Sequence, residues 1–267
     1  MGEKQIEKVF FQKTYKALRD KTDKGTFIPY KQGFYEKYIK RFFDIICSFL
    51  AILCFGWLYI SVAVLVRIKL GSPVLFVQPR LGLIDPETGK ETIFMMYKFR
   101  SMTDERDING KPLPDDMRLT KFGKTLRNTS LDELPETFNI LKGDMSIIGP
   151  RPLLARDIVF MTDAQRKRHT VRPGLSGLAQ IHGRNEIDWE DKLNWDLKYV
   201  QRITFRMDLK IIFQTVIKAF LKKEGIVQDN MATAQDFGDY LLDRGKVSKE
   251  EYDSKQAEAR EILNDIE

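Results

Sequence analysis

The feature that most constrains this chain is an almost unbroken apolar stretch over residues 42–66. Its one charged residue, Asp44, lies near the start of the stretch. At about 1.5 Å per helical residue, the stretch is long enough to cross a hydrocarbon layer of roughly 30 Å. The sequence therefore predicts a helical segment that lies in a membrane.

Basic residues flank both ends of this stretch, at Lys37, Lys40 and Arg41 before it and at Arg67 and Lys69 after it. The positive-inside rule therefore favours a cytoplasmic location for both ends. A bent, re-entrant helix hairpin satisfies this rule, with Gly56 as the candidate for the bend because glycine tolerates a break in a helix. A straight transmembrane helix with the N-terminal arm outside is the alternative.

Overall composition limits the classes of function. The net charge of +6 predicts an anionic partner such as a phosphate, nucleic acid or anionic lipid. Cys47 and Cys54 both lie in the apolar stretch, which fits neither a disulfide framework nor a metal site and favours a reducing, cytosol-facing location. His169 and His182 lie in no ligand motif, which argues against a zinc site or a Ser-His-Asp triad.

The chain is predicted to be an α+β protein, mainly α, in three parts. These are a basic N-terminal arm (1–36), a compact cytosolic catalytic domain (37–225) that includes the membrane hairpin (42–66), and a C-terminal helical appendage (226–267). Residues 74–78 and 92–99 are typical of a small β-hairpin. Helices are predicted at 131–141, 189–199, 208–221, 237–242 and 248–266.

The predicted helix at 208–221 is amphipathic. Its apolar side chains recur at helical spacing at Leu209, Ile212, Phe213, Val216, Ile217 and Phe220. Lysines close by give it the composition of a helix in a lipid interface. Packing onto the protein's own core predicts the same pattern, so both interpretations stay open.

The segment with the clearest chemistry runs from Arg127 to Pro135 and contains Asp132 and Glu133 side by side. One carboxylate can attack phosphorus while its neighbour holds a metal ion. Repulsion within the pair raises a pKa, but we expect a metal ion and helix-end amides to favour the charged form. Ser130 and Glu133 also match a capping box, a purely structural role that Pro135 fits poorly.

Basic residues that suit phosphate contacts occur on both sides of this pair. They are Lys98, Arg100, Arg118, Lys121, Lys124, Arg127, Arg151, Arg168, Arg172 and Arg184. The planar guanidinium group binds phosphate through two hydrogen bonds, although each residue taken singly is also typical of a solvated surface. Glycine-rich nucleotide-binding motifs are absent from the sequence, so a nucleotide would have to be bound in another way.

Five motifs together resemble the bacterial sugar transferase family, the monotopic phosphoglycosyl transferases. They are Tyr97-Lys98-Phe99-Arg100-Ser101-Met102, Ser130-Leu131-Asp132-Glu133-Leu134-Pro135, Leu141-Lys142-Gly143-Asp144-Met145-Ser146, Gly149-Pro150-Arg151-Pro152 and Arg172-Pro173-Gly174. With His182-Gly183-Arg184-Asn185 and the apolar stretch, the resemblance covers about residues 37–224. The family usually has Ser-Pro at the hairpin bend, where this chain has Gly56-Trp57, and Leu81 stands where a proline is common.

The resemblance implies a two-step reaction at the cytoplasmic face of the bacterial inner membrane. Asp132 matches the nucleophile that attacks the β-phosphorus of a UDP-sugar and releases UMP; undecaprenyl phosphate then takes the phosphosugar. Glu133 matches the Mg²⁺ ligand. Residues in motifs that line the phosphate-binding region are Lys98, Arg127, Arg151, Arg172 and Arg184. Such a reaction is the first membrane step in making a bacterial polysaccharide or glycoconjugate.

Other functions remain as alternatives. A membrane-anchored scaffold could use the basic face on lipid or polysaccharide without turning over a substrate. We expect no nucleic-acid partner, because no base-stacking motif or known nucleic-acid module accompanies the charges. The C-terminal appendage is predicted either to contact another protein or a second copy of this chain, or to be a solvated helical hairpin.

Overall fold

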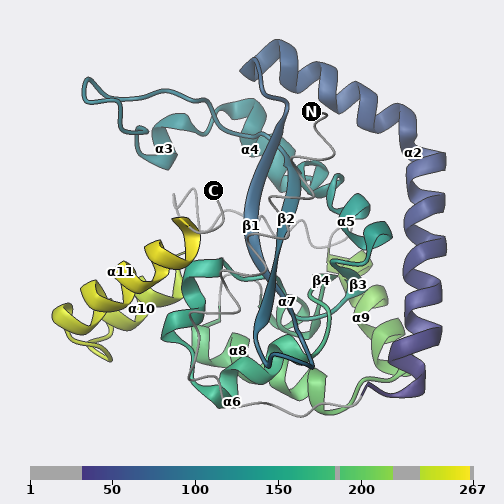
Figure 1. Cartoon of the computed structure of the whole chain (residues 1–267). Coiled ribbons are helices and arrows are strands. Elements are labelled where there is room, and N and C mark those ends of the chain that lie inside the picture. The colour runs from purple at the N-terminus through teal and green to yellow at the C-terminus, as the bar shows by residue number, and fades with distance from the viewer. Residues whose placement is uncertain (1–31, 184–186, 219–234, 265–267) are drawn as a thin grey trace, which may run out of the picture.

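The computed structural model describes residues 32–183, 187–218 and 235–264 (Figure 1). Most of the predicted N-terminal arm (1–36) therefore lies outside the described residues. The described chain starts with a π-helical segment, η1 (Tyr35–Lys40), which leads into the long helix α2 (Arg41–Leu70). Together they form one helix long and apolar enough to cross a membrane.

The helix is not interrupted at Gly56, the residue predicted for the bend, because α2 continues through it. Without a proline at this point, the backbone hydrogen bonds of the helix are not interrupted. Figure 1 shows that α2 nevertheless changes direction, running along one side of the molecule and then across its end. The re-entrant hairpin predicted for 42–66 is thus a single bent helix here, and its topology in a membrane stays a prediction.

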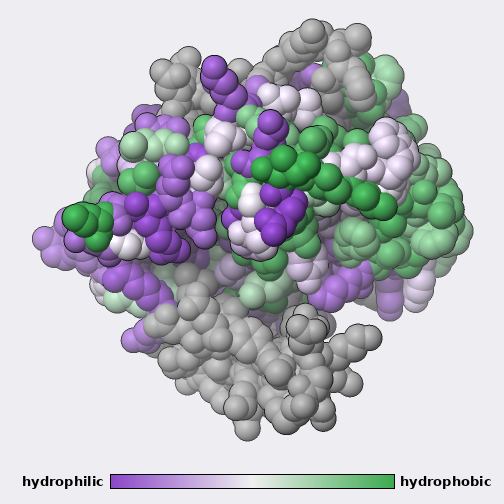
Figure 2. Space-filling view, turned by 90° about the horizontal axis from the view of Figure 1, so that it is seen from above, coloured by the Kyte–Doolittle hydropathy of each residue, from purple (hydrophilic) through white to green (hydrophobic). Residues whose placement is uncertain are grey.

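Both ends of α2 are attached to the rest of the protein. At the start, Arg41 Nη1 donates to the Ile140 carbonyl over 2.6 Å. At the end, Arg100 donates to the carbonyls of Leu70 and Ser72. Only 11% of the most apolar part of this helix is buried, and Figure 2 shows apolar side chains gathered on the flank along which α2 runs.

An antiparallel β-hairpin crosses the middle of the molecule, as predicted. Strand β1 (Leu75–Ile84) pairs with β2 (Glu91–Phe99), and β1 is longer than the sequence pattern indicated. A second, parallel pair of short strands, β3 (Ser146–Ile148) and β4 (Gly174–Ser176), was not predicted. The close approach of the chain at these two strands requires glycine, since a Cβ on Gly174 would lie 2.0 Å from the Gly149 nitrogen.

Short helices and 3-10 turns surround these strands, which confirms an α+β fold that is mainly α. They are α3 (Asp115–Arg118), α4 (Lys121–Asn128), η2 (Leu131–Glu133), α5 (Glu136–Lys142), η3 (Ala155–Phe160), α6 (Asp163–Arg166), η4 (Lys167–Thr170), α7 (Leu178–Gly183), α8 (Trp189–Gln201) and α9 (Phe205–Ile217). Phe94 and Met96 of β2 pack with Ile140 and Met145, so the hairpin and α5 share one core.

Helix α9 buries only part of its apolar surface. Ile211 is fully buried among residues of α7 and α8, which supports packing onto the protein's own core. Phe205, Leu209 and Phe213 are more than half exposed, which fits a helix in a lipid interface. The Phe205 ring lies 6.2 Å from that of Phe43, so the exposed faces of α9 and α2 meet.

The C-terminal appendage forms two helices, α10 (Phe237–Asp243) and α11 (Lys249–Asn264), as predicted. The expected capping contact is present, with the Glu251 backbone N–H donating to Ser248 Oγ over 3.1 Å. Both helices pack against η3 of the same chain. They are therefore not a solvated hairpin, and a protein partner for this region stays a prediction.

Candidate active site

The predicted helix at 131–141 is wrong in its first part, and this places the two candidate carboxylates on a turn. Ser130 adopts a left-handed conformation with φ of 55°. Asp132 and Glu133 follow on the 3-10 turn η2, and α5 starts only after Pro135. Proline lacks an N–H and suits the start of a helix. Ser130 makes no side-chain capping bond, so the alternative capping box is not formed.

Glu133 lies between two cations from distant parts of the chain. Lys98 Nζ, on β2, lies 2.9 Å from Glu133 Oε1. Arg151 Nη2, from the loop after β3, lies 2.8 Å from the same oxygen. Lys98 also lies 3.1 Å from Glu136 Oε1 at the start of α5. The sheet, the loop and α5 therefore meet at one cluster of charges.

These contacts set the protonation states of the cluster. Burial alone would raise the pKa of Glu133, but Lys98 and Arg151 outweigh it and hold that pKa well below its usual range. Burial raises the pKa of Glu136, although Lys98 opposes this. Glu133 is thus a fixed negative charge, whereas Glu136 holds a proton more readily than an ordinary glutamate.

Asp132 is 8% exposed and lies beside this cluster. Burial, together with the neighbouring Glu133, raises the pKa of Asp132 to about 6, against opposing effects of Lys98, Arg127 and Arg151. The sequence predicts effects that favour the charged form of this carboxyl group, but it does not reveal burial, which favours the protonated form. The carboxylate is still ionised at neutral pH and is more basic than an ordinary aspartate, which suits a nucleophile.

Three of the five predicted phosphate-binding residues act on this pair of carboxylates. Lys98 and Arg151 contact Glu133 directly, and the charge of Arg127 reaches Asp132. Arg127 is oriented by a 2.8 Å hydrogen bond from its Nε to Ser101 Oγ. Arg184 lies outside the described residues. Binding of phosphate by any of these side chains stays a prediction.

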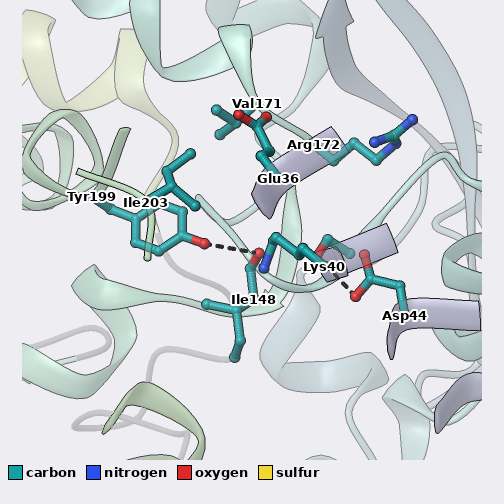
Figure 3. Close-up of a pocket in the computed structure, with 9 residues that line it drawn as sticks. Glu36, Lys40, Asp44, Ile148, Val171, Arg172, Tyr199 and Ile203 are labelled. Atoms are coloured by element: carbon teal, nitrogen blue, oxygen red, sulfur yellow. Dashed lines mark hydrogen bonds between the residues drawn. The ribbon is translucent and has the colours of Figure 1, made fainter. Parts of the chain in front are cut away.

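Arg172 lies in a different place. Its Nε donates to the Gly143 carbonyl over 3.0 Å, just beyond α5. The side chain lines a small cavity beside the start of α2, together with Glu36, Lys40 and Asp44 (Figure 3). Arg172 is not among the largest influences on the pKa of Asp132 or Glu133. The sequence motif therefore does not by itself bring Arg172 to the carboxylate pair.

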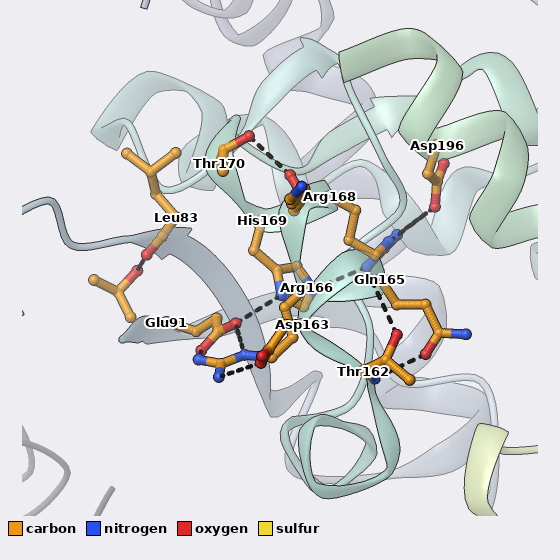
Figure 4. Close-up of polar contacts among 12 residues, drawn as sticks. Leu83, Glu91, Thr162, Asp163, Gln165, Arg166, Arg168, His169, Thr170 and Asp196 are labelled. Carbon is orange, nitrogen blue, oxygen red and sulfur yellow. Dashed lines mark hydrogen bonds and ion pairs between the residues drawn. The ribbon is translucent and has the colours of Figure 1, made fainter. Parts of the chain in front are cut away.

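Other basic residues of the sequence motifs have structural contacts. Arg100 holds the last turn of α2 through carbonyl oxygens. Arg168 is 1% exposed and lies 2.6 Å from Asp196 Oδ2 (Figure 4). It also donates to the Arg151 carbonyl over 2.7 Å. Arg168 thus anchors the backbone of a residue in the charge cluster rather than facing solvent.

Sequence reasoning missed Glu136 and Asp196. Glu136 lies three residues after Glu133, so spacing could have signalled that the two acids are neighbours. Their shared contact with Lys98 depends on the fold. Asp196 had no such signal, because its partner Arg168 is 28 residues away and becomes adjacent only through folding.

Comparison with known proteins identifies the family of the chain. A family model described as bacterial sugar transferase matches residues 35–222. The chain is 48% identical over 199 residues to the sugar transferase EpsL of Bacillus subtilis, covering 74% of this chain and 95% of that protein.

Two further relatives are longer proteins. A UDP-glucose:undecaprenyl-phosphate glucose-1-phosphate transferase of Klebsiella pneumoniae is 40% identical, covering 69% of this chain and 40% of the relative. A UDP-N-acetylgalactosamine-undecaprenyl-phosphate N-acetylgalactosaminephosphotransferase of Aeromonas hydrophila is 37% identical, covering 67% of this chain and 43% of the relative. The chain thus spans about two fifths of these proteins. On the family match and these identities, the chain belongs to the bacterial sugar transferase family.

Proposed function

We propose that this protein transfers a sugar-1-phosphate from a UDP-sugar to undecaprenyl phosphate, with Asp132 as the nucleophile. The observation that carries the proposal is Asp132 itself, a buried, basic carboxylate next to Glu133, Lys98 and Arg151. The names of the Klebsiella and Aeromonas relatives give undecaprenyl phosphate as their acceptor. Their sugars differ, so the donor is assigned here only as a UDP-sugar.

The first step forms an aspartyl phosphosugar. An Asp132 carboxylate oxygen attacks the β-phosphorus of the donor, and the bond from that phosphorus to the oxygen bridging the two phosphates breaks. UMP leaves with the electron pair of that bond. Lys98 and Arg151 are ion-paired with Glu133, the neighbour of the nucleophile, and Arg127 adds a third positive charge. These charges would stabilise the negative charge on the departing phosphate.

The second step regenerates the enzyme. A phosphate oxygen of undecaprenyl phosphate attacks the phosphorus of the intermediate, and Asp132 departs as a carboxylate. The product is an undecaprenyl diphosphate that carries the sugar. Because the intermediate is covalent, the water-soluble donor and the lipid acceptor can bind one after the other.

Glu133 fits the proposed Mg²⁺ site. Among the described residues there is no cluster of three or more Asp, Glu, His or Cys side chains that could hold a metal. Mg²⁺ needs no such cluster, because one or two carboxylates with water and substrate phosphates suffice. The hydrogen bonds from Lys98 and Arg151 both go to Oε1 of Glu133, so Oε2 can serve as a ligand. The bound ion would neutralise negative charge on the diphosphate.

The exposed apolar surface supports work at a membrane, with lipid as a further partner. Side chains of α2 and α9 form this surface, and Phe138 of α5 extends it to the helix that follows the Asp132 turn. A lipid-borne phosphate lies at the height of the membrane surface, which brings it within reach of this helix. We place the protein at the cytoplasmic face of the bacterial inner membrane, in the first membrane step of polysaccharide or glycoconjugate synthesis.

The experiment that tests the proposal uses the donor alone. Membrane preparations of the native chain are mixed with a set of UDP-sugars and Mg²⁺, and UMP release and protein mass are measured. We expect one equivalent of UMP and a phosphosugar adduct on Asp132. Asp132→Asn should give neither, whereas the exposed Asp116→Asn should behave like the native protein. UMP release that is equal in Asp132→Asn and native protein would remove Asp132 as nucleophile and indicate another mechanism. If neither protein released UMP from any UDP-sugar, the result would favour the non-catalytic scaffold.

A further inference from the structure

The helices α10 and α11 lie outside the residues that the family model matches, yet they contact the segment that follows Arg151. The family match ends at residue 222, and α10 starts at Phe237. In Figure 1 the two helices, drawn in yellow, lie at the side of the molecule opposite α2. Both pack against η3, which starts at Ala155, four residues after Arg151.

The contact is a shared hydrophobic core rather than a loose surface contact. Phe237 is 1% exposed and belongs to the same buried cluster as Leu153, Ala155 and Phe160. Burying an apolar side chain of this size stabilises a fold. The segment after Arg151 therefore depends on the appendage for part of its stability.

One glycine allows the two elements to approach. A Cβ added to Gly238 would lie 2.6 Å from Cε2 of Phe160, well inside van der Waals contact. The Phe160 ring is itself 5% exposed and also faces the Tyr252 ring at 5.8 Å. It has little room to move, so a side chain at position 238 would force α10 away from η3.

Polar contacts also hold the start of α10 against η3 and α8. The Phe237 backbone N–H donates to Asp157 Oδ1 over 3.3 Å, and Asp236 forms an ion pair with Arg156. The Trp189 indole N–H donates to the Gln235 carbonyl over 3.1 Å. These directional bonds set the position of α10 along η3 and α8.

The segment held by the appendage is the one that carries Arg151. On its other side this segment is bound to β1, where the Leu81 N–H donates to the Leu153 carbonyl over 3.1 Å. Arg151 then reaches Glu133 over 2.8 Å with a side chain that is 49% exposed. The position of the Arg151 backbone therefore helps to determine whether its guanidinium reaches Glu133.

We propose that the α10–α11 pair is a brace that positions Arg151 against Glu133, so that the appendage contributes to phosphate handling in the active site. The inference rests on the proposed function, because it assigns Arg151 to the reaction. The appendage touches no reacting atom. It acts through the backbone of residues 152–157.

The test uses Gly238→Val in the full-length chain, with Ala257→Val at an exposed position of α11 as the matched control. UMP release from a UDP-sugar is measured at several donor concentrations. We expect Gly238→Val to lower kcat/KM by about tenfold, and Ala257→Val to leave it unchanged. Hydrogen exchange of residues 153–160 should rise in Gly238→Val alone.

A double-mutant cycle separates positioning from general loss of structure. If the appendage acts through Arg151, Gly238→Val should have little further effect in an Arg151→Ala background. Equal fold-losses in both backgrounds would overturn the brace. Should Gly238→Val not fold, Phe237→Leu is carried through the same cycle with the same criteria. A native chain that releases no UMP from any UDP-sugar would instead overturn the proposed function, and in that case the hydrogen-exchange result alone decides whether α10 orders the 153–160 segment.

Discussion

Asn139 on α5 fixes the backbone of Tyr97 on β2. Its Oδ1 accepts a 3.1 Å hydrogen bond from the Tyr97 N–H, and its Nδ2 donates to the Met95 carbonyl over 2.8 Å. Asn139 is completely buried. Lys98 follows Tyr97, and Glu136 lies one turn before Asn139, so this amide sets the distance between the strand and the helix that make the charge cluster.

Replacing Asn139 with alanine should therefore damage both stability and the site. The substitution leaves a partly buried N–H and a partly buried C=O without these partners, at a cost of up to about 1 to 3 kcal/mol for each group. We expect a lower free energy of unfolding and slower UMP release from the donor. Denaturant unfolding measures the first effect. The exposed Asn128→Ala is the control, and an Asn139→Ala protein as stable as the native chain would contradict the prediction.

The buried pair of Glu91 and Arg166 should make stability depend on pH. Burial alone would raise the pKa of Glu91, but hydrogen bonds from His169 and Arg166 lower it to about 2 (Figure 4). A carboxylate whose pKa is lowered by folding stabilises the protein above its unfolded pKa and loses this effect as pH falls toward the folded value. Glu91→Gln should therefore cost about 3 kcal/mol at pH 7.

The difference between native protein and Glu91→Gln should shrink as pH is lowered from 5 toward 2. Thermal unfolding at a series of pH values measures it. Glu87→Gln, in the exposed turn of the hairpin, is the control and should match the native protein throughout. If the loss of stability in Glu91→Gln stayed constant from pH 7 to pH 3, the lowered pKa of Glu91 could not be its cause.

The sequence predicted the elements whose signal is local. The β-hairpin follows from strand residues on either side of a turn, and the C-terminal end of α5 follows from Gly143, which adopts φ of 106°. The helices α8, α10 and α11 follow from periodicity and capping residues. The pairing of β3 with β4 could not be predicted, because two three-residue strands carry too little pattern and meet only through close contact of Gly149 with Gly174.

The candidate site was likewise predictable only where its residues are close together in the sequence. Asp132 and Glu133 are adjacent in sequence, so their proximity needed no fold. The contacts of Glu133 with Lys98 and Arg151 depend on folding, because these residues are 35 and 18 positions away from Glu133 in the sequence. The raised pKa of Asp132 depends on burial, which is a tertiary property. Arg168 and Arg172 show the limit of motif reasoning, because arginines in similar sequence settings hold carbonyl oxygens instead of the carboxylate pair.

Glu133 provides a test of the proposed Mg²⁺ site. Glu133→Gln keeps an oxygen that can accept hydrogen bonds from Lys98 and Arg151 but removes the charge that would bind the cation. We expect UMP release to fall by about 100-fold and the Mg²⁺ concentration for half-maximal rate to rise. A chelator should stop the native reaction. The exposed Glu105→Gln is the control, and an unchanged Mg²⁺ titration in Glu133→Gln would exclude this residue as the ligand.

The attachments of α2 predict its topology in the membrane. Arg41 at its start holds the carbonyls of Ile140 and Leu141, and Arg100 holds its end at Leu70. Because one compact domain holds both ends, and a polar domain cannot lie on two sides of a bilayer at once, both ends of α2 should lie on the same side. The bent course of α2 in Figure 1 agrees with this.

Thiol labelling in oriented vesicles tests this topology. The free cysteines Cys47 and Cys54 are replaced by alanine, and a single cysteine is introduced by Lys37→Cys or Lys69→Cys, both at exposed positions. In a re-entrant arrangement, a membrane-impermeant reagent labels both variants in inside-out vesicles and neither in right-side-out vesicles. In a spanning arrangement, each vesicle type labels one variant only. That second pattern would mean that the contacts of Arg41 and Arg100 with the same domain cannot both exist in the membrane.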